Sequence, residues 1–437
     1  MNKWHRSKTS KQAYIVFLWC LILLLFLSAC GSPSSSNSIF DQLPIPSERS
    51  SANQPLSAQN LSHLHPLWTY TFDPDLPLSM TVANSIVYAV TTYRDFSYSL
   101  VAVQNGKRLW RYQTPDQKQF ISDIQVGGGV VYLAVRTIVS PSADTIYAIN
   151  ARTGQELWHS ASKDDINQLM YAYTLLYFST QREVHALDAQ TGKLQWSYQF
   201  SDGSNYSPFS PSLAVAAESL YISLATSPYR ADLDLIALDG HTGKVQWQQS
   251  EIGGVSTSLV VDNGVVYQRV HCWSSPYRVS AFNAETGKEL WNIAVESPGA
   301  YDTDGMDVAH NLLYMDGAGH IQAFDVSTGH LVWSTGLEGK RVFIGPIVGN
   351  GVVYVGTETP VTGMQRLFQP PARASEWLYA LDAQSGKLVR MLQDDDSSFR
   401  PEILKLDNEH LYVSGSRSFL GSDETAKGKP DLYALGV

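Results

Sequence analysis

The chain has 437 residues, of which 44% are hydrophobic and only 16% charged, and its formal net charge is −10. Binding to nucleic acid needs a basic surface that neutralises phosphates, so this charge argues against that class of protein. Only three cysteines occur, Cys20, Cys30 and Cys272. The first two lie in the export segment described next, so we expect no internal disulfide in the mature chain.

Residues 1–30 are predicted to be an export signal. Lysine and arginine open the segment, residues 14–27 form an apolar run that is short for a membrane span, and Ser28 and Ala29 precede Cys30. This ending resembles the lipobox of bacterial lipoproteins, in which Cys30 carries the lipid and becomes the mature N-terminus. An uncleaved anchor helix is the alternative. Either one predicts an extracytoplasmic protein held at a membrane.

Residues 31–65 are rich in Ser, Pro, Asn and Gln and have no strand periodicity. Such composition is typical of a disordered tether. A flexible coil of this length reaches roughly 30 Å on average. The segment would therefore hold the folded domain, predicted to be a single unit over 66–437, away from the membrane surface without fixing its orientation.

One sequence unit recurs along the predicted domain and is seen clearly in Ala186–Trp196, which reads Ala-Leu-Asp-Ala-Gln-Thr-Gly-Lys-Leu-Gln-Trp. Other copies span 102–110, 148–158, 237–247, 281–291, 323–333 and 380–390. An eighth copy is divided, because its front half (432–435) ends the chain and its back half (66–70) opens the domain. Self-similarity at a regular period indicates a repeat architecture.

Most units read as a strand, a tight Asp-x-x-Thr-Gly turn (with Asn in place of Asp in two copies) and a second strand that ends in a large aromatic ring. A ring that recurs once per repeat is expected to pack against the neighbouring repeat every time. The expected docking residues are Trp68, Trp110, Trp158, Trp196, Trp247, Trp291, Trp333 and, in the seventh unit, Arg390. A guanidinium is less apolar than indole, so we predict that the joint after the seventh unit is looser.

Two further strands precede each unit, as in 121–126 and 130–132, and turn signals such as Gly-Gly or Asn-Gly separate them. Four strands repeated eight times predict an all-β fold, a single eight-bladed β-propeller with four-stranded blades. The divided copy predicts that the last blade is closed by pairing the N-terminal strand (67–72) with the C-terminal strand (432–437).

The Ala-x-Asp-x-x-Thr-Gly-Lys-x-x-Trp motif resembles the tryptophan-docking repeat of the pyrroloquinoline quinone (PQQ)-like β-propeller family. The resemblance covers nearly all of residues 66–437. The family includes quinoprotein alcohol dehydrogenases and also non-catalytic lipoproteins, among them the propeller subunit of the outer-membrane barrel-assembly machinery. The resemblance implies the fold, but function must be argued from a site.

The enzymatic branch of the family implies a quinone beside a Ca²⁺ ion. Asp302, Asp304 and Asp307 alternate around Gly305 and are a weak candidate for such a metal site, although no glutamate follows at the spacing of an EF-hand loop. A polar turn that enters a strand is the alternative interpretation. The chain also has no adjacent cysteine pair like the one found in many of these dehydrogenases. We therefore expect neither PQQ nor calcium, and a binding protein rather than an enzyme.

Loop length is uneven in the predicted propeller. Turns between the first and second and between the third and fourth strands of each blade are short, whereas the loops on the opposite face are long and varied. Those loops carry a candidate binding face of aromatic residues: Tyr93, Phe96, Tyr98, Tyr229, Trp273, Tyr277, Phe368, Trp377 and Phe419. Packing of these rings over blade edges is the alternative.

These features predict a membrane-anchored extracytoplasmic lipoprotein that binds proteins or acts as a scaffold, with assembly of envelope or outer-membrane proteins as one form of that role. We expect a protein partner in the cell envelope, and nothing in the sequence implies an obligate oligomer. A PQQ-dependent dehydrogenase and a propeller that binds envelope polysaccharide are the alternatives.

Overall fold

The computed structural model describes most of the chain from Pro55 to Val437. The described residues are 55–72, 75–93, 97–116, 119–137, 144–200, 211–225, 233–250, 255–271, 277–295, 305–317, 319–337, 341–358, 376–394, 400–407, 409–416 and 432–437. Over these ranges the chain forms 32 strands and one short 3-10 helix, η1 (Leu61–His63). The predicted all-β class is therefore confirmed.

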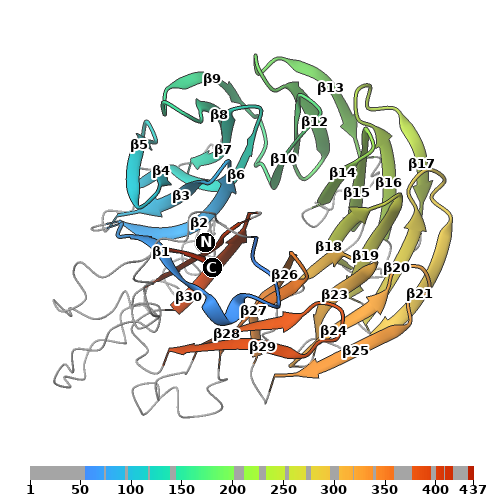
Figure 1. The fold of residues 1–437 in the computed structure, drawn as a ribbon. Coiled ribbons are helices and arrows are strands. Elements are labelled where there is room, and N and C mark those ends of the chain that lie inside the picture. The colour runs from blue at the N-terminus through green and yellow to red at the C-terminus, as the bar shows by residue number, and fades with distance from the viewer. Residues whose placement is uncertain are drawn as a thin grey trace, which may run out of the picture.

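The strands form eight four-stranded antiparallel sheets arranged around a centre, which confirms the eight-bladed propeller (Figure 1). Strands A to D of each blade run from the centre outward. Blades 1 to 4 contain β2 (Leu76–Ala83), β3 (Ile86–Thr92), β4 (Tyr98–Gln104) and β5 (Lys107–Gln113); β6 (Gln119–Gly127), β7 (Val130–Thr137), β8 (Thr145–Asn150) and β9 (Glu156–Ala161); β10 (Gln168–Ala172), β11 (Leu175–Ser179), β12 (Glu183–Asp188) and β13 (Leu194–Gln199); and β14 (Ser212–Ala216), β15 (Ser219–Ala225), β16 (Leu233–Asp239) and β17 (Val245–Gln249).

The remaining blades follow the same order. Blades 5 to 8 contain β18 (Val255–Asp262), β19 (Val265–His271), β20 (Tyr277–Asn283) and β21 (Glu289–Val295); β22 (Met306–Ala309), β23 (Leu312–Gly317), β24 (His320–Asp325) and β25 (Leu331–Gly336); β26 (Arg341–Gly349), β27 (Val352–Glu358), β28 (Glu376–Asp382) and β29 (Leu388–Asp394); and β30 (Arg400–Leu406), β31 (Leu411–Ser416), β32 (Leu432–Gly436) and β1 (His65–Tyr70).

Blade 8 is built from both ends of the folded chain. Its outer strand β1 pairs with β32 in an antiparallel register that sets His65 opposite Gly436 and Tyr70 opposite Leu432. The predicted closure of the ring by the terminal strands is confirmed. Blade 8 therefore has no turn between its C and D strands, because β32 and β1 come from opposite ends of the described residues.

The turns explain why the strands meet with constant geometry. Between the A and B strands, pairs such as Gly128-Gly129 and Asn350-Gly351 take positive φ at both positions, which is the type I′ hairpin turn that matches strand twist. Between the C and D strands, Asp188 accepts hydrogen bonds from the amide (2.8 Å) and hydroxyl (2.7 Å) of Thr191. All these turns lie on one side of the ring, which we call the turn face. The B–C and D–A connections lie on the other, which we call the loop face.

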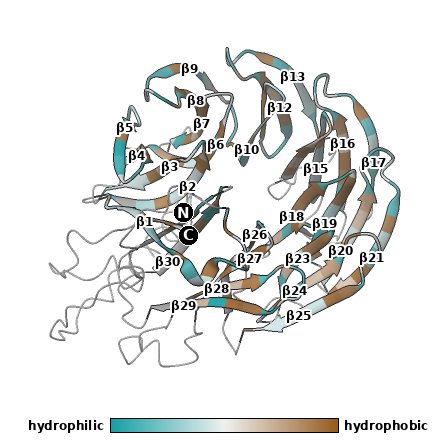
Figure 2. Cartoon of the chain, viewed as in Figure 1, coloured by the Kyte–Doolittle hydropathy of each residue, from teal (hydrophilic) through white to brown (hydrophobic). Residues whose placement is uncertain are grey.

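The core is divided among the blade interfaces. Among the described residues, eight hydrophobic clusters are found, and each joins two neighbouring blades. Figure 2 shows hydrophobic residues concentrated in the middle strands, whereas the outer strands alternate with polar residues. The burial pattern of β13 alternates in this way, while β11 is buried throughout. Stability therefore depends on every blade having two neighbours.

The folded unit begins earlier than the sequence predicts. Residues 55–64 fall in the range assigned to a tether, yet Leu56 and Leu61 are fully buried and Leu64 is 3% exposed. They pack between blades 7 and 8. The predicted boundary at Pro66 is therefore corrected, since these leucines are buried in the folded unit. Residues 1–54, with Cys30, lie outside the described residues.

Candidate functional site

Six joints between blades are built in one way. The indole Nε1 of each docking tryptophan donates a hydrogen bond of 2.8 to 3.1 Å to a backbone carbonyl in the C–D turn of the next blade. The pairs are Trp110 with Ala151, Trp158 with Ala189, Trp196 with Gly240, Trp247 with Ala284, Trp291 with Val326 and Trp333 with Ala383. These six tryptophans thus lie between neighbouring blades.

The turn glycine is required by the same contact. Gly192 has φ +69°, and a Cβ built on it would lie 2.6 Å from the Trp158 ring of the preceding blade. Gly243 repeats this arrangement under Trp196, also with 2.6 Å. The glycine of the motif therefore has two roles: it adopts the left-handed backbone conformation, and it leaves room for the tryptophan ring.

A buried tyrosine on the B strand supports five of these joints. The hydroxyl groups of Tyr88, Tyr132, Tyr177, Tyr221 and Tyr314 donate to the same carbonyl as the tryptophan, at 3.1 to 3.3 Å. Each of these carbonyls accepts two bonds from the blade before it. These tyrosines lie on the B strands, outside the tryptophan motif, so the motif alone does not predict them.

The joint between blades 7 and 8 differs from these six. Arg390 occupies the tryptophan position, and its Nη1 donates to the carbonyls of Leu61 (2.6 Å) and Ser62 (2.7 Å) in the N-terminal segment. Burial lowers the pKa of the Arg390 guanidinium. Tyr354, the tyrosine of blade 7, is 1% exposed, and its hydroxyl has no hydrogen-bond partner among the described residues.

The base of the loop face is held by arginine–aspartate pairs. Arg136 contacts the fully buried Asp144 at 3.2 Å, and Asp144 also accepts a 2.7 Å bond from the amide of Ile166. Burial raises the pKa of the Asp144 carboxyl, although the amide and Arg136 oppose that shift. Between blades 5 and 6, the guanidinium of Arg269 lies 3.0 Å from Asp316, and both side chains have 0% exposure. The loops are thus mounted on a fixed base.

The predicted aromatic face is only partly within the described residues. Tyr93 follows β3 and is 36% exposed, so it is available to a partner. Tyr277 stacks on His271 of its own blade, with ring centroids 4.5 Å apart. Tyr98 contacts Phe120 of the neighbouring blade 2 with ring centroids 6.0 Å apart. The backbone of Trp377 pairs with Thr357 inside β28 and is therefore not in a loop. Phe96, Tyr229, Trp273, Phe368 and Phe419 lie outside the described residues.

Asp307 of the acidic cluster lies on β22, the innermost strand of blade 6. Asp307 accepts bonds from the amide of Val308 and from the amide of Val348 in blade 7, both at 2.8 Å, and burial raises the pKa of its carboxyl. Asp123 makes the same link from blade 2 to Leu169 of blade 3, at 2.7 Å. These contacts account for the carboxylate of Asp307 without a metal. Asp302 and Asp304 lie outside the described residues.

A quinone and Ca²⁺ would need oxygen ligands that converge on one point. Within the ranges that the structure describes, no group of three or more His, Cys, Asp or Glu side chains could hold a metal ion. Of the three candidate carboxylates, only that of Asp307 is among the described residues, and it accepts bonds from two backbone amides. In the same ranges, no helix has the length and hydropathy of a membrane span.

Four-stranded blades joined by docked tryptophans define a β-propeller of the PQQ-like class. A family model described as outer membrane protein assembly factor BamB matches residues 142–256 and 231–397, together more than half of the chain. The chain belongs to this family.

Individual relatives are distant and include an enzyme. The polyvinylalcohol dehydrogenase of Sphingopyxis sp. (strain 113P3) is 22% identical, over 60% of this chain and 57% of its own length. The outer membrane protein assembly factor BamB of Yersinia pestis is 21% identical, over 67% of this chain and 71% of its own length. The crystal structure of BamB from Moraxella catarrhalis is similar with a TM-score of 0.52 at 16% identity, covering 85% of this chain and 97% of that chain. The chain thus spans less than two thirds of the dehydrogenase, and the structural likeness bears on the fold alone.

Proposed function

We propose that this chain is a membrane-anchored extracytoplasmic scaffold that binds a protein partner in the cell envelope and contributes to the assembly of outer-membrane proteins. Its membership of the BamB family carries the proposal. The architecture supports it, because uniform joints and buried arginine–aspartate pairs make a rigid base for the loops. Rigid scaffolds place binding residues on their loops.

The partner is proposed to bind on the loop face. Tyr93, which follows β3, is an exposed aromatic residue, and Phe368 belongs to the same predicted face. A photo-crosslinking amino acid at either position should capture outer-membrane assembly proteins in intact cells, identified by mass spectrometry. The same group at Lys193, in a C–D turn on the opposite face, is the control. Crosslinks from 193 with none from 93 or 368 would show that the turn face binds.

The anchor is proposed to be a lipid on Cys30. A Cys30→Ala chain should no longer incorporate labelled fatty acid, whereas the parent chain should carry the label and sediment with membranes. Loss of outer-membrane proteins from cells that lack the gene, restored by the parent chain, tests the assembly role separately. Normal outer-membrane composition in those cells would contradict it.

A PQQ-dependent dehydrogenase is the second candidate, and the likeness to polyvinylalcohol dehydrogenase favours it. The purified chain, mixed with PQQ and Ca²⁺, would then reduce a dye in the presence of an alcohol. Asp302→Ala and Asp304→Ala variants give the specific test, since both residues belong to the weak metal candidate. Saturable turnover that these changes abolish would replace the scaffold proposal.

A further inference from the structure

The joint between blades 7 and 8 lacks the structural element on which the six tryptophan joints depend. Blade 8 has no C–D turn, because β32 ends at Gly436 and its neighbour β1 begins at His65. A tryptophan at position 390 would therefore find neither a turn carbonyl nor a turn glycine. Among the described residues the Tyr354 hydroxyl likewise has no acceptor, whereas its counterpart Tyr177 donates to Gly240 at 3.2 Å.

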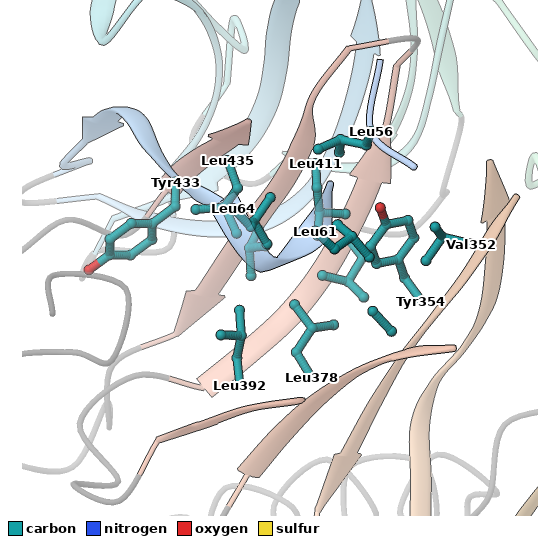
Figure 3. Packing of buried hydrophobic residues seen from close by; sticks show 13 residues of the cluster. Leu56, Leu61, Leu64, Val352, Tyr354, Leu378, Leu392, Leu411, Tyr433 and Leu435 are labelled. Carbon is teal, nitrogen blue, oxygen red and sulfur yellow. The ribbon is translucent and has the colours of Figure 1, made fainter. Parts of the chain in front are cut away.

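Residues 55–64 occupy this position. Figure 3 shows Leu56, Leu61 and Leu64 gathered with Tyr354, Leu378, Leu392 and Leu411 of the two blades. The small cavity that remains is lined by Leu61, Leu64, Tyr354, Leu378, Ala380, Arg390, Leu392 and Leu411. Residues from both blades thus enclose the segment.

The segment is also held by polar contacts of its own. Its backbone folds into the turn of η1 through bonds from Leu61 to Ser57 (3.2 Å) and from Leu64 to Leu61 (3.1 Å). The carbonyl oxygens of Leu61 and Ser62 in this turn accept hydrogen bonds from Arg390. An arginine can donate to two carbonyls at once, which an indole with one N–H cannot do.

We propose that residues 55–64 are a strap that closes the ring in cis, in place of the C–D turn that blade 8 lacks. The groove between blades 7 and 8 is the docking surface, and it recognises three leucines and a pair of backbone carbonyls. The occupant is the chain's own segment, because Leu64 directly precedes β1 of the same joint. This short connection gives the strap a high effective concentration at the groove.

The strap also fixes where the N-terminal part of the chain meets the propeller. It packs with Val352, Leu411 and Leu435, which lie at the turn-face ends of β27, β31 and β32. Release of the strap would expose this apolar groove at one joint and leave the six tryptophan joints intact. The joint between blades 7 and 8 therefore depends on the strap rather than on the tryptophan motif.

Hydrogen exchange followed by mass spectrometry tests this inference on the full chain in detergent. Arg390→Ala and Leu61→Asp should each speed exchange at least tenfold in peptides that cover 55–64 and 352–356, with 186–197 unchanged. Leu194→Asp is the control, because Leu194 is 58% exposed on β13, away from the seam. Arg390→Lys should give an intermediate rate, since it keeps the positive charge and its donors.

Two results would contradict the proposal that residues 55–64 close the ring in cis. Unchanged exchange at 55–64 in Arg390→Ala would show that the arginine contact does not hold the segment, and this variant decides the case if Leu61→Asp does not fold. Light scattering on the parent chain should give a monomer. A dimer in which two chains exchange residues 55–64 would show that the groove is filled in trans.

Discussion

The joint between blades 3 and 4 and the joint between blades 7 and 8 solve the same packing problem with different residues. In the first, Trp196 and Tyr177 both donate to Gly240 of the next blade, and the ring rests on Gly243. In the second, Arg390 donates to a separate segment of the chain, some 330 residues away in sequence. The Tyr354 hydroxyl has no hydrogen-bond partner among the described residues. The tryptophan motif is therefore not self-sufficient, because each copy depends on a turn that the following copy supplies.

The difference arises from the way the ring is closed. A propeller must have its two chain ends somewhere, and here they meet inside blade 8, between its C and D strands. This closure preserves the strand pairing of blade 8, but the blade has no C–D turn. The seam consequently relies on the strap, a contact that ordinary repeats do not need.

The largest effect is expected from removing the closing strand. Deletion of residues 432–437 takes away β32, whose residues from Leu432 to Leu435 are all fully buried, and leaves β31 and β1 without their common neighbour. We expect the loss of cooperative thermal unfolding, measured by near-ultraviolet circular dichroism. Removal of Val437 alone is the control, because it lies beyond β32. A deletion that melts like the parent chain would contradict closure by the two termini.

The next effect separates the two kinds of joint. Trp196→Ala should lower the free energy of unfolding by about 3–5 kcal/mol, as expected for the loss of a large packed ring. Arg390→Ala removes two charge-assisted hydrogen bonds at a half-buried site and should cost about 1–3 kcal/mol. Urea unfolding measures both values. Equal costs would mean that the seam is as strong as a tryptophan joint and that the predicted looseness is wrong.

Glycine substitutions test whether the tryptophan ring packs against the turn glycine. Gly264→Ala adds a methyl group where nothing lies within 4 Å, so it bears only the strain of φ +77°, about 1–2 kcal/mol. Gly192→Ala bears similar strain and also pushes against the Trp158 ring, so we expect about 2–4 kcal/mol in the same unfolding assay. If both variants lose equal stability, the ring does not rest on the glycine as described.

A smaller contrast is expected between two tyrosine hydroxyls. Tyr177→Phe removes a bond to Gly240 and should cost about 0.5–1.5 kcal/mol. Tyr354→Phe removes a buried hydroxyl without a partner among the described residues and should be neutral or stabilising. Thermal melting of the two variants side by side measures the contrast. A destabilised Tyr354→Phe chain would indicate an acceptor for that hydroxyl at the seam.

The smallest effect concerns pH and the regular turns. Bonds from the Thr191 hydroxyl and amide lower the pKa of Asp188 below its ordinary 3.8. Its stabilising contribution is therefore present above pH 3.8 and lost as the pH falls through the lowered value. Asp188→Asn should change stability at pH 7 by less than about 0.5 kcal/mol, since Asn283 forms the same turn in blade 5. It should lose slightly less stability than the parent as the pH falls below 3.8, measured by thermal melting.

Much of the fold could be predicted because the repeat is a local signal. The Asp-x-x-Thr-Gly turn and the strands around it are determined by residues next to one another, so the eight blades and their four strands follow from the pattern. Strand bounds came within a few residues, since the closing strand was predicted at 67–72 and lies at 65–70. Which aromatic rings are exposed was harder to predict, because a contact such as the stacking of His271 on Tyr277 joins two neighbouring strands.

The sequence by itself therefore determined the all-β class, the number of blades and the closure of blade 8, since each rests on short-range periodicity. The tertiary structure alone decided that residues 55–64 are part of the domain, that Arg390 binds Leu61, and that Asp123 and Asp307 link neighbouring blades. The physical reason is that each of these contacts joins residues far apart in sequence, so no local pattern predicts it. Composition places residues 55–64 with the polar segment before them, but a leucine is buried or exposed according to the groove that it meets.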